Sequence, residues 1–126
     1  MGRADCDAES AAPYIDISNI VDIIGGVNPT EALKALANEH RLRIMQWLKE
    51  PTRHFHHDSD VDMEQVGVCV GEIQRVLELT QSTTSQYLGI LQKANLVTST
   101  RIGKWTYYRR NEAAIQELRD FIDTEL

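Results

Sequence analysis

The sequence lacks the features of secreted, membrane-spanning and disordered proteins. Its 126 residues include only 2 cysteines, 3 prolines and 7 glycines. Two cysteines are too few for a disulfide scaffold, and no run of about 18 apolar residues is present to span a membrane. The first seven residues include acids where a signal peptide needs a basic and then an apolar stretch. We therefore expect a single cytoplasmic domain with no membrane partner, whose cysteines are thiols.

Acidic residues are absent from one long stretch, although the chain as a whole has a net charge of −6. The 33 residues between Glu78 and Glu112 contain no Asp or Glu and hold five cations. The other 93 residues hold the remaining 8 cations and all 19 acids, a charge of −11. Such asymmetry is typical of a protein that turns one face toward a polyanion. Chance clustering on a solvated face is the alternative.

The chain divides into an N-terminal arm, residues 1–27, and one domain, residues 28–126. Residues 1–12 have no apolar period, and residues 14–24 could form a short helix. The run Asn28-Pro29-Thr30-Glu31 is typical of a helix start, with Asn as N-cap and Pro in the first turn. The helix that follows is expected to turn Leu33, Leu36 and Ala37 toward the core.

Four further helices, one long loop and a β-hairpin are expected. Helical spacing predicts helices over residues 39–50, 70–79, 81–95 and 112–126, with Pro51, Thr80 and Asn111 as boundary residues. Residues 52–66 are expected to be a loop, which is long for a compact domain. After residue 96 the apolar period changes from 3.6 to 2, and Gly103 marks a hairpin turn between residues 97–101 and 105–109.

This order predicts an α+β fold, mainly α with a β-hairpin wing: a winged helix-turn-helix with an α-α-α-α-β-β-α core and an N-terminal extension. In such folds the second helix of the pair lies in the major groove of DNA, with its N-terminal residues on base edges. Here that helix begins with short hydrogen-bonding side chains and no acids. The residues expected to face the groove are Gln81, Ser82, Thr83, Ser85, Gln86 and Tyr87.

The hairpin is expected to add electrostatic contacts to DNA. Arg101 and Lys104 lie at its tip, where they could follow a backbone or enter a minor groove, and Arg109 and Arg110 would attract phosphates. Two other interpretations stay open. The Ser- and Thr-rich helix start could simply cap itself, and the fold could be a winged-helix module that binds protein without binding DNA.

Several stretches resemble the ArsR/SmtB-type family of winged-helix bacterial transcriptional repressors. Residues 33–45 (LKALANEHRLRIM) resemble its second-helix signature, and residues 67–73 (GVCVGEI) resemble its metal-box helix. Residues 80–88 (TQSTTSQYL), 94–97 (ANLV) and 101–108 (RIGKWTYY) resemble its recognition helix and wing. The resemblance covers about residues 28–122. It implies a homodimer formed by the first and last helices, a pseudo-palindromic DNA operator, and release from DNA when an effector binds.

The resemblance also raises the question of a metal effector. The arsenic and cadmium branches carry Cys-Val-Cys where this chain has Cys69-Val70-Gly71. A zinc branch carries Cys-Val-Gly-Asp, and this chain has Glu72 in place of the Asp. Zinc or another thiophilic ion would need further ligands. The candidate ligands are Cys69, Glu72, Cys6, His54, His56 and His57. The family's second site, on the last helix, needs histidines that residues 112–126 do not contain.

Other interpretations of these residues remain open. Cys69 could be a small buried hydrophobe, Cys6 and Cys69 could act as a redox pair, or the inducer could be a thiol-reactive or other small molecule. A hydrolase built on the His- and Asp-rich loop is a further alternative. The sequence has no nucleophile elbow, no phosphate loop and no His-Glu-x-x-His, so we expect no enzymatic activity.

Overall fold

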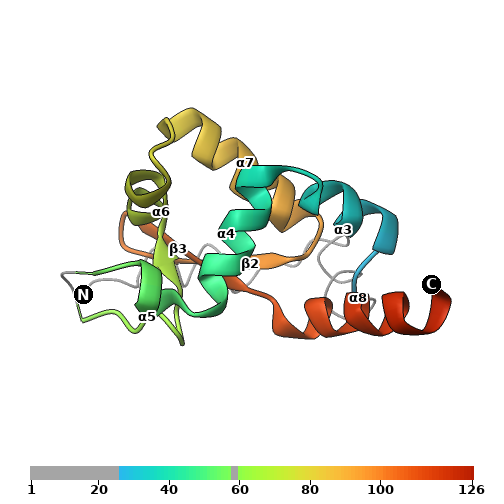
Figure 1. Ribbon diagram of the computed structural model, residues 1–126. Helices are drawn as coiled ribbons and strands as arrows, with labels where there is room; N and C mark the ends of the chain where they lie inside the picture. The colour runs from blue at the N-terminus through green and yellow to red at the C-terminus, as the bar shows by residue number, and fades with distance from the viewer. Residues whose placement is uncertain (1–25, 58–59) are drawn as a thin grey trace.

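The computed structural model describes residues 26–57 and 60–126 as a set of helices around a small sheet (Figure 1). The predicted helix within residues 14–24, and Cys6, lie outside the described residues. None of the helices in the described ranges is both long and apolar enough to cross a membrane. The elements in chain order are α3 (Pro29–Leu36), α4 (Glu39–Lys49), α5 (Pro51–His54), β1 (Val68–Cys69), α6 (Val70–Leu77), α7 (Gln81–Lys93), β2 (Val97–Ile102), β3 (Trp105–Arg110) and α8 (Glu112–Glu125).

The predicted winged helix-turn-helix is confirmed, together with its helix starts. The side chain of Asn28 accepts a hydrogen bond from the Glu31 amide at 3.1 Å, and that of Thr80 accepts one from the Thr83 amide at 3.1 Å. Asn111 caps α8 in the same way. Each cap satisfies an amide that the first helical turn leaves without a partner, which is why these positions set the element boundaries.

The turn between α6 and α7 comes earlier than the sequence predicts. The helix ends at Leu77 rather than Leu79, because Glu78 adopts a left-handed conformation with φ of 57°. The amides of Glu78 and Leu79 donate back to the carbonyls of Arg75 and Gln74, which closes the helix end. Glycine usually marks this conformation, so a glutamate at the position gives no sequence signal.

The predicted hairpin of β2 and β3 is confirmed, and a third strand that the sequence does not predict extends it to an antiparallel sheet of order β1-β3-β2. The two-residue strand β1 pairs Val68 with Tyr108 and Cys69 with Tyr107. Gly67, with φ of 126°, precedes it, and a Cβ there would lie 2.5 Å from the carbonyl oxygen of Tyr108. The predicted loop over residues 52–66 also contains α5, whose first residue is Pro51. Strand β1 thus holds Cys69 against the wing.

The core lies where α4, α6 and α7 meet the sheet. Its largest fully buried side chains are those of Ile44, Ile73, Leu88, Leu91, Leu96, Val68, Val97 and Thr84. Thr84 is tolerated there because its hydroxyl donates to the Thr80 carbonyl at 2.8 Å. The predicted inward face of α3 is wrong in part. Ala32 and Ala35 are buried and Leu33 is 41% exposed, because α3 turns its small residues toward α4 and α7.

Helix α8 packs on the body through its first half and beside α3 (Figure 1). Ala114 and Leu118 are buried, and the Glu117 carboxylate accepts a hydrogen bond from the Val27 amide at 3.0 Å. The second half differs, since Ile122 is 42% exposed and Leu126 is 86% exposed. The apolar face of α8 is therefore only partly buried by its own protomer.

Candidate DNA-reading surface and wing pocket

Helix α7 presents one continuous polar stripe to solvent. Gln81, Ser82, Ser85 and Gln86 are all exposed, and their spacing of i, i+1, i+4 and i+5 places them on one helix face. The opposite face carries Thr84, Leu88 and Leu91 into the core. Four of the six predicted groove residues therefore share one surface. Because the buried face is anchored at three positions, the stripe is held on a rigid element.

Tyr87 faces α4 instead of lying on this stripe. Its ring stacks on His40 with a centroid distance of 6.0 Å, and the guanidinium carbon of Arg41 lies 5.6 Å from its centroid. Arg41 is itself held by a 2.6 Å hydrogen bond from its Nε to the Ala35 carbonyl. The predicted orientation of Tyr87 toward DNA therefore differs from the structure, where the ring packs α7 against α4. Thr83 is half-buried as well.

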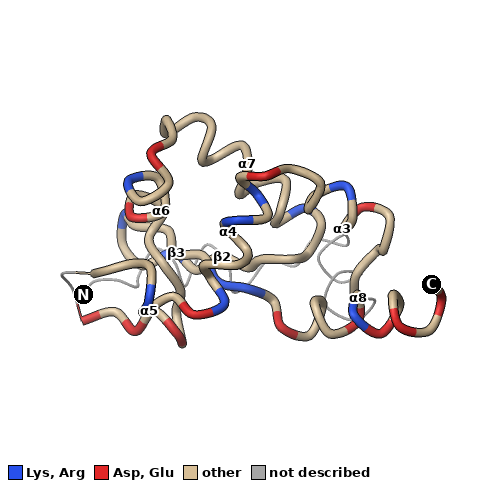
Figure 2. The backbone as a smooth tube through the Cα atoms, in the orientation of Figure 1, with Lys and Arg blue, Asp and Glu red and all other residues tan. Residues whose placement is uncertain are grey.

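Two of the predicted wing cations lie near its turn, and Arg109 lies near the far end of β3. Arg101, Lys104 and Arg109 are exposed. The Nε of Arg101 donates to the Gly103 carbonyl at 3.1 Å, and the Nζ of Lys104 lies 5.4 Å from the ring centroid of Trp105. Figure 2 shows acids on α8, on the segment after α5, on α6 and at the starts of α3 and α4, whereas no acid lies along α7 or either hairpin strand.

Arg110 serves the fold rather than the surface. Its side chain is only 9% exposed and forms an ion pair with Glu112, with an Nε–Oε2 distance of 3.0 Å. A second nitrogen of its guanidinium donates to the Met45 carbonyl at 3.4 Å. In this conformation the guanidinium is paired with Glu112, and the phosphate contact from Arg110 stays a prediction. The sequence places Glu112 close by but does not show that the Arg110 side chain is buried.

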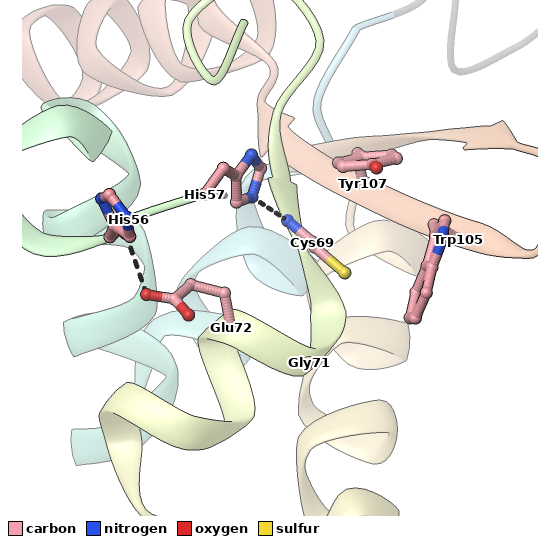
Figure 3. A pocket seen from close by; sticks show the side chains of 7 residues that line it. All are labelled: His56, His57, Cys69, Gly71, Glu72, Trp105 and Tyr107. Atoms are coloured by element: carbon pink, nitrogen blue, oxygen red, sulfur yellow. Dashed lines mark hydrogen bonds between the residues drawn. The ribbon is translucent and has the colours of Figure 1, made fainter. Parts of the chain in front are cut away.

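A pocket of about 400 Å³ lies between the wing and the start of α6 (Figure 3). Its aromatic wall comes from β3, and its other walls come from β1, α6 and the segment after α5. The Cys69 side chain points toward Trp105, beside the Tyr107 ring. Gly71 lacks a side chain that would crowd the thiol. The lining residues are His56, His57, Cys69, Gly71, Glu72, Trp105 and Tyr107.

The pocket gathers four of the six predicted metal ligands, and two of them, His57 and Glu72, already accept hydrogen bonds inside the protein. The Nε2 of His57 accepts a hydrogen bond from the Cys69 amide at 3.1 Å. The Glu72 carboxylate accepts from the His56 amide at 2.8 Å and from two nitrogens of Arg75. Among residues 26–57 and 60–126, no group of three or more His, Cys, Asp or Glu could hold a metal. As arranged, these residues do not fit a zinc site.

His54 lies away from these groups. Its ring stacks on Trp47 with a centroid distance of 5.0 Å and an interplanar angle of 6°, and it is not among the residues that line the pocket. Cys6, the remaining candidate ligand, lies outside the described residues. Sequence reasoning missed Trp105 and Tyr107 as pocket residues, because only the strand pairing of β1 with β3 brings them beside Cys69.

Glu72 contributes an ionised carboxylate to the pocket lining. The hydrogen bonds from Arg75 hold the pKa of this carboxyl below its ordinary value of 4.5; partial burial acts in the opposite direction, and the His56 amide lowers the pKa further. A lowered pKa in the folded state means that the ionised carboxylate stabilises the fold above pH 4.5. That stabilisation is lost as the pH falls through the folded-state pKa.

We expect Glu72→Gln to lower the free energy of unfolding at pH 7 by about 1 kcal/mol, a value reduced for the solvent exposure of Arg75. The difference in free energy of unfolding between the variant and the wild type should become smaller below pH 4.5. Urea unfolding at pH 7 and pH 3.5 would measure it. Glu39→Gln is the matched control, because its pair with Arg43 is 3.5 Å long and exposed. An equal gap at both pH values would contradict this account.

Comparison with known proteins matches this arrangement to one family. The model of the "Bacterial regulatory protein, arsR family" matches residues 64–99, which span β1, α6, α7 and the start of β2. YbzH of Bacillus subtilis, an uncharacterized HTH-type transcriptional regulator, is 55% identical over 100 residues, 79% of this chain and all of YbzH. The arsenical resistance operon repressor of the same organism is 33% identical over 88 residues, 70% of each chain.

A solved structure agrees with these sequence matches. HlyU from Vibrio cholerae superposes with a TM-score of 0.51 at 26% identity, covering 77% of this chain and 91% of HlyU. The residues that the family model matches contain α7 with its acid-free polar stripe, and YbzH is described as a transcriptional regulator. The chain therefore belongs to the ArsR family of helix-turn-helix, DNA-binding transcriptional regulators.

Proposed function

We propose that the protein is a homodimeric repressor that binds a pseudo-palindromic operator and leaves it when an effector occupies the wing pocket. The polar stripe of α7 carries the DNA part of this proposal. Gln81 and Gln86 lie on it with Ser82 and Ser85, free to bond base edges and with no acid to repel phosphates. An α-helix fits the major groove, and glutamine can pair with the N6 and N7 of adenine.

The wing supplies the sequence-independent contacts. Arg101, Lys104 and Arg109 project from the same acid-free segment and would lie along the flanking phosphates. Family membership favours DNA over the alternative of a protein-binding module. Among the described residues, none of the acids lies on α7 or on the hairpin strands, so the overall acidity does not oppose this contact (Figure 2).

The outer half of α8 supports a dimer. Ile122 and Leu126 are exposed apolar residues on an element that already packs beside α3. Pairing two such faces around a two-fold axis would bury them and present two α7 helices to successive major grooves. The operator would then have matching half-sites about one helical turn, or a multiple of it, apart.

The wing pocket supports regulation by an effector. A molecule in the pocket would contact Trp105 and Tyr107 of β3 and, at the same time, the start of α6. Helix α6 packs on α7, and Trp105 carries Lys104 over its ring. Coupling requires that the effector bind the free and DNA-bound shapes with different affinity. Because the described residues do not fit a metal, we favour a thiol-reactive or other small molecule that reaches Cys69.

The DNA part is tested by the salt dependence of binding. Duplexes selected from a random library by repeated binding would serve as operators, with an unselected duplex as reference. Arg101→Ala with Lys104→Ala should weaken binding to both and flatten the log–log salt slope by roughly one unit for each phosphate that is no longer bound.

The charge-matched control is Lys49→Ala with Arg53→Ala, which removes two exposed cations from α4 and α5. An unchanged slope in the wing variant would show that the wing does not bind phosphates. An absence of salt-dependent binding in the wild type would overturn the proposal as a whole. Repression itself is tested by a reporter whose promoter overlaps the selected site, where expression should fall when the protein is present.

A further inference from the structure

Helix α7 has a glycine in its interior that its own fold does not require. Gly89 is exposed, and apart from the neighbouring backbone of α7 no atom of the described residues lies within 4 Å of where its Cβ would stand. Its φ is not positive, unlike those of Gly26, Gly67 and Gly103. Glycine weakens a helix interior relative to alanine, so neither backbone geometry nor packing within the described residues explains its presence.

The position of Gly89 on α7 points to an external reason. It lies one turn beyond Ser85 and Gln86 on the exposed polar stripe, and eight residues, or about 12 Å, from Gln81. The N-terminal residues of a recognition helix reach the base edges. About two turns beyond these N-terminal residues, at Gly89, a helix in the groove would pass close to the sugar–phosphate backbone. The exposed Lys93, one turn beyond Gly89, is placed to meet the same phosphates.

We propose that Gly89 is a positioning residue, where the sugar–phosphate backbone of one DNA strand rests directly on the main chain of α7. This rests on the proposed placement of α7 in the major groove. A methyl group at this point would hold the strand away by on the order of 1 Å. Hydrogen bonds from Gln81 and Gln86 to bases tolerate a change of only about half an ångström in donor–acceptor distance. The absence of a side chain at position 89 therefore sets how deeply α7 enters the groove.

Gly89→Ala gives opposite effects on folding and binding. The melting temperature of the free protein should rise by about 2–4 °C, because alanine strengthens the helix. The Kd for the selected operator should rise at least about tenfold, and discrimination against the unselected duplex should fall. A variant that is more stable yet binds less well cannot owe its weaker binding to unfolding. Unchanged affinity for the operator would overturn the proposal.

Gln116→Ala is the control. Gln116 is an exposed residue of α8, outside both the polar stripe of α7 and the wing pocket. Its operator affinity should equal that of the wild type. The dimer dissociation constant, from sedimentation of each variant, should be unchanged by Gly89→Ala; weaker dimers would mean that a partner subunit, not DNA, covers Gly89, and would also overturn the proposal.

Gly89→Lys separates close contact from open space. If a strand lies against the main chain, lysine should weaken operator binding more than alanine does. If space remains, lysine would gain a phosphate contact, tighten binding and steepen the salt slope, which overturns the proposal. Gln81→Ala and Gln86→Ala, measured alongside, distinguish a failure of this inference from a failure of the proposed placement of α7. If they weaken binding while Gly89→Ala does not, only this inference fails, and if none has an effect, the placement of α7 fails.

Discussion

Replacing Gln81 and Gln86 with alanine is expected to weaken binding to the selected operator by about 1–3 kcal/mol for each glutamine that pairs with a base. This corresponds to a roughly five- to 150-fold rise in Kd per glutamine, and binding to an unselected duplex should change much less. The reason is that a glutamine on a base edge contributes only where the base matches. Phosphate contacts from the wing contribute on every sequence.

The measurement is the Kd on both duplexes at one fixed salt concentration, for each single variant and the double variant. Gln116→Ala serves as the control, because Gln116 is an exposed glutamine on α8, away from the stripe. Equally weakened binding to the two duplexes would mean that α7 only positions the protein.

Tyr87→Ala should instead lower stability, since the ring packs against His40 and Arg41.

Alkylation of the Cys69 thiol by N-ethylmaleimide is expected to lower operator affinity at least about tenfold, within the range usual for allosteric coupling. The thiolate adds to the maleimide double bond, and the proton that completes the adduct comes from water. The adduct would occupy the pocket beside Trp105 and alter the contact between the wing and α6. Cys69→Ser should bind operator normally and show no response to the reagent.

Cys6→Ser is the matched control, because the chain has only these two cysteines. It should respond as the wild type does. Zn²⁺ is tested in parallel on all three proteins. Release by zinc that needs both thiols would show that Cys6 completes a metal site that the described residues lack. If neither reagent changes operator affinity in the wild type, reduced beforehand and freed of reductant, Cys69 is a packing residue and the pocket does not respond to zinc or to thiol-reactive effectors.

The sequence determined the backbone architecture through local signals. Asn28, Thr80 and Asn111 bond amides within their own first helical turns, so the chemistry that begins each helix is contained in a few consecutive residues. The change of apolar period after residue 96 likewise predicts the hairpin without reference to the rest of the chain. The exposed stripe of α7 follows from the same periodicity, since the buried Thr84, Leu88 and Leu91 leave Gln81 and Gln86 outside.

Only the tertiary structure determined which residues line the pocket and which partners individual side chains contact. Strand β1 is two residues long, too short for an alternating pattern, and it exists because the distant strand β3 supplies its hydrogen bonds. That pairing places Cys69 beside Tyr107 and Trp105. Arg110 and Tyr87 have side chains suited to DNA, yet Glu112 pairs with one and α4 packs on the other. A side chain's role depends on which partner folding brings to it, and contacts between distant segments leave no local pattern to predict them.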